Sequence, residues 1–399
     1  MAQTQLKRIV VLGGGPAGVQ TFQSLCTLLA KSPVKTSLTL VSNAEAHFNN
    51  IAVPRVIASP QIPPTKLLRP LKQMFTGSNG SDQRLVIASV TSVDEKKVHI
   101  DAGDSIDYDY LVVALGSRYT LPFKGLAGPG SETAEALYKV AAQITQSDRI
   151  LVLGMGIVAV ETAAEIKSAY PNKTVTVAGP KLLAQAPEAF VARVRSILAT
   201  LGVEVVENVR GDTAALLAST GAASYPIVHP GGVSVALTST TDSSQSAASV
   251  TADMVFASTG ITPNSEPLKS SVWPLTTRGF LRTSRGMQVV GHDNVFAVGD
   301  IAETEPVSPF AGKLAYLAAQ QAPIAAKNLA AVVEGKAATA QWTPPADFMT
   351  FGAFGPKHGA AYLPGIKMGM GLTSFIAKQV KGRDGGLGMV TYLKETMYL

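Results

Sequence analysis

Two glycine-rich segments have the residue types and the spacing that bind the phosphates of a dinucleotide. The first, Gly13-Gly14-Gly15-Pro16-Ala17-Gly18, matches G-x-G-x-x-G, and the second, with Gly154, Gly156 and Ala159, matches the variant G-x-G-x-x-A. Glycines permit a tight turn and a close approach of the backbone to a pyrophosphate, whose charge the start of the following helix attracts. We therefore expect both segments to bind nucleotides, although a glycine turn that only packs a strand on a helix has the same pattern.

The residues after the second strand of each unit bear on which nucleotide is bound. A carboxylate at this position commonly binds the ribose hydroxyls. The first unit has Ser42-Asn43 here, with Glu45 slightly later, and all three are candidates for the ribose. The second unit has no carboxylate but has Lys181, which would suit a 2′-phosphate and favours NADPH; a surface lysine is an equally good interpretation.

A third chemical signal is an acid at the end of a strand. Residues 295–300 run into Gly299-Asp300, where a carboxylate can accept hydrogen bonds from a polyol chain. Alone this is a common strand-end turn. Its occurrence together with the two glycine loops, with Ala114-Leu115-Gly116 and with Thr259-Gly260 makes a nucleotide-binding interpretation more specific.

The elements that must position these residues are short buried strands and helices. A strand at 7–12, a helix to about residue 29 and a strand at 37–41 surround the first loop. The second loop lies between strands at 149–153 and 174–177, and this recurrence predicts two dinucleotide-binding domains. We assign residues 1–120 and 285–335 to the nucleotide-binding domain with the first loop, 121–284 to the domain with the second loop, and 336–399 to a C-terminal domain.

Other stretches give weaker signals. Short strands are expected between residues 85 and 113, and 117–130 looks like a crossing between domains. Residues 233–237 alternate like a strand of a hairpin, with 238–249 as a flexible tip. Residues 312–333 predict a helix that Pro323 kinks or breaks, and 342–399 predict strands and a helix.

Composition excludes several classes of protein. The chain has 399 residues, of which 46% are hydrophobic, and its single cysteine excludes an internal disulfide, a Cys-x-x-Cys redox centre and a cysteine-rich zinc site. We expect no metal site. No secretory signal or spanning apolar run is visible, so we expect an intracellular protein, cytoplasmic or peripheral on a membrane such as the mitochondrial surface.

The net charge of +6 permits contact with acidic surfaces, but no run of five basic residues is present and nucleic acid is an unlikely partner. From residue 357 onward, six basic residues stand against two acidic ones, with apolar side chains among them. Such a segment could dock on a membrane surface and admit a lipid-soluble quinone; a domain lid or a dimer face is the equally weighted alternative.

Taken together, these motifs resemble the two-dinucleotide-binding-domain flavoproteins of the pyridine nucleotide-disulfide oxidoreductase superfamily. Within it, the chain resembles apoptosis-inducing-factor homologues, including ferroptosis suppressor proteins and fungal relatives; type II NADH dehydrogenases are similar but more distant. The supporting stretches are 47–50 with Arg55, 313–318 and 381–384. The resemblance implies an α/β fold with two interleaved Rossmann-like domains plus a C-terminal α+β segment. It also implies FAD as the cofactor of the first loop, of 114–116 and of Gly299-Asp300, in the domain of residues 1–120 and 285–335, and NAD(P)H as the nucleotide of the second loop, in the domain of residues 121–284.

The resemblance also implies roles for single residues. Arg55 would touch FAD, Val90 would lie by the adenine, and Glu161 and Lys313 would lie beside the flavin where the nicotinamide docks. A helix-start acid and a solvated lysine are the plain alternatives for Glu161 and Lys313.

The implied function is an FAD-dependent oxidoreductase that takes hydride from NAD(P)H and passes electrons to a quinone-like acceptor. Two alternatives stay open at this point. One is a flavoprotein with a signalling or nucleic-acid-binding role. The other is a tailoring oxidoreductase acting on a small metabolite, in which residues 211–250 and the C-terminal segment shape the pocket.

Overall fold

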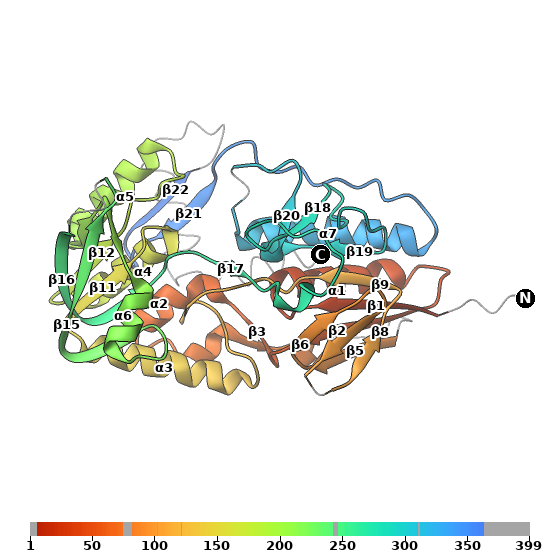
Figure 1. Cartoon of the computed structure of the whole chain (residues 1–399), viewed down its shortest axis with the longest axis horizontal. Helices are drawn as coiled ribbons and strands as arrows, with labels where there is room; N and C mark the ends of the chain where they lie inside the picture. Colours follow the sequence, from red (N-terminus) through yellow and green to blue (C-terminus); the bar gives the residue numbers. More distant parts are fainter. Residues whose placement is uncertain are drawn as a thin grey trace, which may run out of the picture.

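The computed structural model describes residues 6–74, 82–101, 103–120, 122–241, 246–309 and 312–362. These residues form a mixed α/β fold built on two large sheets, one in each half of the molecule (Figure 1). No helix in these ranges is both long and apolar enough to cross a membrane.

The first sheet is entirely parallel, in the order β19-β9-β1-β2-β5. Its central strands are almost fully buried because both faces are covered, which explains their continuous apolar runs. Helices α1 and α7 share one buried cluster with the sheet, and a small antiparallel sheet, β6-β7-β8, contributes to the cluster on the other face. The elements are β1 (Lys7–Leu12), α1 (Pro16–Leu29), β2 (Thr36–Ser42), β5 (Asp82–Ile87), β6 (Val90–Val93), β7 (Lys97–Ile100), β8 (Ser105–Asp107), β9 (Tyr110–Val113), β19 (Val295–Ala297) and α7 (Ala315–Val333).

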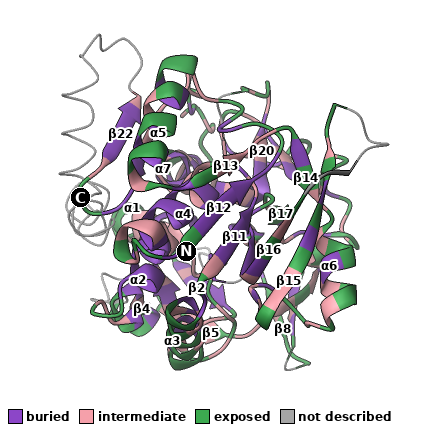
Figure 2. Ribbon diagram, turned by 90° about the vertical axis from the view of Figure 1, so that its left-hand side faces the viewer, coloured by how far each residue is buried: buried purple, intermediate pink, exposed green. Residues whose placement is uncertain are grey.

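The second sheet has the order β13-β12-β11-β16-β15-β14. Its first four strands are parallel to one another, and the last two, β15 and β14, each pair antiparallel with the strand before them. Strands β11 and β12 are buried, whereas β15 exposes many of its side chains (Figure 2). The elements of this half are β11 (Arg149–Leu153), α4 (Ile157–Ala169), β12 (Thr174–Ala178), α5 (Glu188–Leu201), β13 (Glu204–Val206), β14 (Val209–Gly211), α6 (Thr213–Thr220), β15 (Ile227–Ser239) and β16 (Ser246–Ala257).

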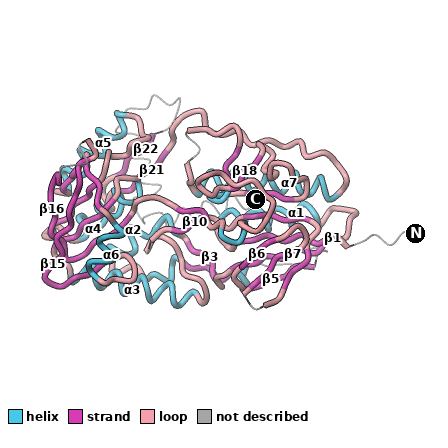
Figure 3. Tube along the Cα trace, in the orientation of Figure 1, coloured by secondary structure: helices cyan, strands magenta, loops and turns pink. Residues whose placement is uncertain are grey.

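The chain crosses between the two halves several times. Helices α2 (Val53–Ala58) and α3 (Gly130–Gln146) lie beside the second sheet, where α2 packs on α4 (Figure 1). The outgoing crossing strand β10 (Ser117–Arg118) pairs with the returning strand β17 (Thr262–Pro263). Past α7, a long loop runs back to the hairpin of β21 (Thr350–Ala353) and β22 (Gly359–Tyr362), as Figure 3 shows. Two further pairs join β3 (Ala46–Phe48) to β4 (Leu68–Pro70), and β18 (Leu281–Thr283) to β20 (Ala302–Thr304).

Two expectations need correction. The hairpin is longer than predicted, because residues 238–239 and 246–249 belong to β15 and β16 rather than to its tip. Helix α7 begins at Ala315, later than predicted, and Pro323 does not break it, since packing against α1 outweighs the one hydrogen bond that proline removes. A further prediction, strands and a helix in 342–399, falls mostly on residues 363–399, which lie outside the described residues; within 342–362 the structure has the strands β21 and β22.

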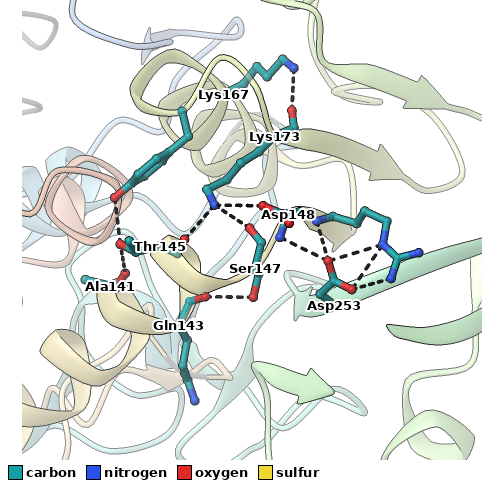
Figure 4. Close-up of polar contacts among 10 residues, drawn as sticks. Ala141, Gln143, Thr145, Ser147, Asp148, Lys167, Lys173 and Asp253 are labelled. Atoms are coloured by element: carbon teal, nitrogen blue, oxygen red, sulfur yellow. Dashed lines mark hydrogen bonds and ion pairs between the residues drawn. The ribbon is translucent and has the colours of Figure 1, made fainter. Parts of the chain in front are cut away.

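A buried lysine ties the end of α3 to the second sheet. The Lys173 ammonium donates to the carbonyl oxygens of Thr145 and Ser147 at 2.9 and 2.7 Å and lies 5.1 Å from the ring centre of Tyr170 (Figure 4). Helix ends leave carbonyls unpaired, and a cation stabilises them. This contact fixes α3 against the sheet that carries the second glycine loop.

Candidate functional site

A cavity of about 500 Å³ opens at the carboxyl ends of the strands of the first sheet. This edge is where open parallel sheets bind nucleotides. The structure brings together here most residues that the sequence assigned to FAD: Gly13, Gly14, Gly15, Pro16, Ala17, Ser42, Asn43, Val90, Ala114, Gly116, Gly299 and Asp300.

The glycines of the first loop serve two different purposes. Gly13 has φ +115°, and a Cβ there would lie 2.2 Å from the Ala114 carbonyl oxygen. Gly18 does not line the cavity; a Cβ on it would lie 1.9 Å from the Gly13 carbonyl oxygen, so it permits packing within the protein. Gly15 has no protein atom within 4 Å of its Cβ position, so this side of the loop is open for a ligand.

The start of α1 fits an anion. Gly15 is its N-cap, no side chain caps the helix, and its first turn has no acidic residue. The backbone N–H groups of this turn and the helix dipole therefore face the cavity without a competing carboxylate from the helix.

Of the three candidates for the first ribose, the structure favours Asn43. The Ser42 hydroxyl donates to the Ala44 carbonyl oxygen at 2.7 Å and accepts from the Ala44 N–H, so its bonding capacity is spent within its own turn. Glu45 is exposed and does not line the cavity. Asn43 is exposed and lines it.

His47 hydrogen-bonds to the backbone of the first glycine loop, a role that the sequence did not reveal. Its Nδ1 lies 3.2 Å from the Gly14 carbonyl oxygen, which can only accept, so Nδ1 carries the proton. Burial lowers the pKa of the ring below its ordinary 6.5, against the carbonyl contact that raises it, and the nearby charge of Arg69 lowers it further. The ring is therefore neutral in the folded protein at neutral pH.

We expect this histidine to make stability depend on pH. The folded-state pKa lies below the unfolded one, so the contribution is complete above about pH 6.5 and is lost as the pH falls through the folded-state value. In His47→Asn the amide keeps a donor near the Nδ1 position but does not titrate. Urea denaturation between pH 7 and 5 should show a steeper loss of unfolding free energy in the wild type than in H47N; parallel curves would contradict this.

A polar network fixes the acid at the end of β19. The Asp300 carboxylate accepts from the Ser117 hydroxyl at 2.6 Å and pairs with the Lys124 ammonium at 3.2 Å. Gln321 of α7 accepts the Gly299 N–H at 2.9 Å, which holds the Gly-Asp turn on the helix. The sequence did not indicate Ser117, Lys124 or Gln321, because each comes from another element than the motif that it supports.

A second cavity, of about 790 Å³, opens beside the second glycine loop. Gly154, Gly156, Lys181 and Gly260 line it, as the sequence predicted for the nicotinamide nucleotide. Gly154 has φ +117°, and its Cβ would lie 2.1 Å from the Ser258 carbonyl oxygen, whereas the Gly156 position has open space. In both loops, therefore, the first glycine of the motif packs against the protein backbone and the second leaves space for a ligand.

Tyr119 and Lys313 line both cavities and mark where they meet. The Lys313 ammonium donates to the Ala302 carbonyl oxygen and lies 4.3 Å from the ring centre of Phe280. Burial lowers the pKa of Lys313 below its ordinary 10.5, although the charges of Asp300 and Glu303 oppose this. Burial also raises the pKa of the Tyr119 phenol, which is therefore a proton donor at neutral pH.

Two residues assigned by resemblance lie elsewhere. Glu161 is 4% exposed and its carboxylate accepts the Ala353 N–H at 2.8 Å, so it anchors the C-terminal hairpin to α4 and lines neither cavity. Arg55 is 5% exposed and is paired with Glu165, with Nη2 2.7 Å from Oε1. The face of α4 that carries positions 161 and 165 packs inward, against α2 and β21, and this burial explains both placements.

We expect the pair of Arg55 and Glu165 to be a structural contact that holds α2 on α4. Arg55→Met should lower the free energy of unfolding by about 3–5 kcal/mol, because it leaves a buried carboxylate without its partner. Replacing both residues by methionine should recover most of that loss. Chemical denaturation checks this, and a double variant as unstable as R55M would contradict it.

Comparison with known proteins gives a consistent result. A family model described as pyridine nucleotide-disulphide oxidoreductase matches residues 7–322. The oxidoreductase ptaL of Pestalotiopsis fici is 30% identical over 345 residues, covering 84% of this chain and 86% of the relative. Apoptosis-inducing factor homolog B of Dictyostelium discoideum is 26% identical over 96% of this chain and 95% of its own. Human ferroptosis suppressor protein 1 is 26% identical over 80% of this chain and 79% of its own.

Solved structures share the fold. That of NDH2 from Plasmodium falciparum in complex with NADH superposes with a TM-score of 0.68 over 97% of this chain and 98% of that one, at 13% identity. An engineered water-forming NADPH oxidase gives 0.64 over 89% and 74%, at 17% identity. The two-domain architecture is therefore the one these proteins use.

Proposed function

We propose that this chain, which belongs to the pyridine nucleotide-disulphide oxidoreductase family, is an FAD-dependent oxidoreductase that takes hydride from NAD(P)H and reduces a quinone-like acceptor. Family membership supports a flavin-dependent NAD(P)H oxidoreductase. FAD and the quinone are our proposals. The observation that carries them is a pair of cavities, each with its own glycine loop, that meet at Tyr119 and Lys313.

The first cavity fits FAD. The open position at Gly15 and the uncapped start of α1 suit the pyrophosphate, and Asn43 and Val90 lie on the side where the adenosine would bind. Asp300, held by Ser117, would accept hydrogen bonds from the polyol chain. The flavin ring would then extend toward Lys313, and the second cavity would hold the nicotinamide nucleotide on the other side of that junction.

When bound, the flavin supplies the acceptance of two electrons from the nicotinamide and their release to the second substrate. The protein's own residues orient the two bound molecules and set the electrostatic potential between them. Lys313 places a positive charge where negative charge increases during the reaction, and its partial burial strengthens that effect by excluding water. Tyr119 can donate a hydrogen bond at the same junction.

Apolar side chains near this junction support a quinone-like acceptor. Leu314, Phe348 and Met349 line the second cavity on the side of the loop before α7 and the segment before β21. A flat, apolar ring suits such a wall better than a charged substrate. Contact with a membrane through the C-terminal segment is part of the proposal; most of that segment lies outside the described residues.

An anaerobic titration tests the function. Purified protein should show a visible flavin band that NADH or NADPH bleaches, and a short-chain ubiquinone analogue should restore it. A flavin band that neither nucleotide bleaches would overturn the oxidoreductase proposal. Rapid bleaching without reoxidation by quinones would leave the flavin chemistry in place and would favour a small metabolite as the acceptor.

A further inference from the structure

The side chains that line the second cavity carry a net positive charge. Three cations, Lys181, Arg210 and Lys313, line this cavity, and within the described residues no aspartate or glutamate does. Lys313 lies at the junction with the first cavity. Lys181 and Arg210 come from segments beside the end of β12, where the ribose of a nucleotide on the second glycine loop is expected.

Backbone pairing brings Arg210 to this position from a separate strand. The Val209 and Asn208 N–H groups donate to the carbonyl oxygens of Gly179 and Pro180 at 3.2 and 3.1 Å. The start of β14 therefore runs antiparallel to the segment that follows β12, which sets Arg210 beside the end of that strand. Sequence analysis identified only Lys181, because Arg210 follows it by 29 residues and has no motif of its own.

The nearest carboxylates are engaged elsewhere. Glu207 accepts the Leu182 N–H at 2.9 Å and pairs with Arg195 at 2.6 Å. Burial acts to raise the pKa of Glu207, but these two contacts and the charge of Lys181 hold it below its usual value, so it is ionised and compensated. Asp212 caps α6, where it accepts the Ala214 and Ala215 N–H groups.

The charged groups of Arg210 and Lys181 can bind a ligand. Among the described residues, no hydrogen bond or ion pair engages the Arg210 guanidinium or the Lys181 ammonium. An arginine and a lysine that line the same cavity, while the neighbouring Glu207 is already paired with Arg195, suit a phosphate dianion, which arginine binds through two parallel N–H groups. An adenosine 2′-hydroxyl, by contrast, would be better served by a carboxylate.

We propose that Arg210, together with Lys181, forms a 2′-phosphate site that makes NADPH the preferred electron donor. This inference rests on the proposed function, because it assigns the substrate of the same cavity. It adds that the discrimination comes from two elements, the end of β12 and the edge strand β14.

The test measures binding rather than turnover, so that it does not depend on the flavin chemistry. Isothermal titration with 2′,5′-ADP and with 5′-AMP, at low and at moderate salt, reports the contribution of the 2′-phosphate alone. The wild type should bind 2′,5′-ADP at least about tenfold more tightly, since a charge-assisted hydrogen bond is typically worth that much. The preference should shrink as salt increases.

Three variants locate the preference. Arg210→Met and Lys181→Met should each remove most of it while affinity for 5′-AMP is unchanged. The matched control is Lys139→Met, which removes an equal charge from the exposed face of α3, away from both cavities, and should retain the preference.

Equal binding of the two nucleotides by the wild type, no binding of either, or a preference that survives R210M would overturn the inference. A failure of this kind is distinct from failure of the proposed function. If NADH bleaches the flavin while 2′,5′-ADP has no advantage, the oxidoreductase stands and the phosphate site falls. If 2′,5′-ADP binds as expected but no nucleotide bleaches the flavin, the phosphate site stands and the oxidoreductase proposal fails.

Discussion

A Gly15→Ala variant is expected to fold as the wild type does and to lose its flavin. In the protein alone, a methyl group at Gly15 meets no atom within 4 Å, and the residue has no left-handed backbone that would resist a side chain. Gly→Ala at such a site is neutral or slightly stabilising, by roughly 0.4–1 kcal/mol. The methyl group would instead occupy the space of the pyrophosphate over the start of α1.

The expected loss is large because the pyrophosphate is bound by ionic hydrogen bonds. Removing one or two, each worth about 1.5–3 kcal/mol, weakens flavin binding on the order of 10- to 10,000-fold. The visible band after purification measures flavin content, and the unfolding midpoint of the flavin-free protein measures the fold. A G15A protein with a full complement of flavin would contradict the assignment of this cavity.

Two further glycines serve as matched controls. Gly156 occupies the same place in the second loop and is equally open, so Gly156→Ala should retain flavin and lose its reduction by NADPH. A Cβ on Gly18 would lie 1.9 Å from the Gly13 carbonyl oxygen, so Gly18→Ala should lower stability and flavin content together. These three different results together distinguish a glycine that contacts a ligand from a glycine that is needed for packing.

The parts of the fold that sequence predicts well are those in which neighbours in the chain are neighbours in space. A strand, a glycine loop and a helix form one continuous unit, so 7–29 and 149–169 could be recognised directly. The same holds for the turn at Gly299-Asp300. Each of these signals needs only local hydrogen bonding and hydrophobic periodicity.

The contacts that sequence could not predict are those between crossing segments. Tyr119 reaches the junction because β10 pairs with β17, 144 residues further along the chain. Arg210 reaches the second cavity because β14 runs beside the end of β12. Arg55 on α2 and Glu161 on α4 show the converse. Their residue types suit a cofactor site, but the packing of α2 and of the C-terminal hairpin on α4 buries both side chains.

The resemblance to a family nevertheless contributed what local pattern could not. It pointed to Lys313, which has no signal of its own in the loop before the alanine-rich helix α7. The structure places Lys313 on the wall of both cavities, next to the Asp300 network. A position at the junction is the property that makes its substitution informative.

Lys313→Met should therefore lower the rate of flavin reduction by about 10²–10³-fold while flavin content and nucleotide affinity change little. The ammonium is the charged group at the place where the two cofactors would meet, and methionine retains its length and its contact with the Phe280 ring. Stopped-flow bleaching of the visible band measures the rate. Lys124→Met is the matched control, because Lys124 also faces Asp300 but lines only the first cavity.

The pH dependence separates a direct role of Lys313 from a structural one. Burial lowers its pKa below 10.5, and the charged form exists below that pKa. The wild-type rate should consequently fall as the pH rises through a value lower than that of an ordinary lysine, and Lys313→Arg should move this alkaline limb to higher pH because guanidinium stays charged. K313M should have no such limb. A limb that persists unchanged in K313M, or a rate within a few fold of the wild type, would assign the charge at this junction to another group.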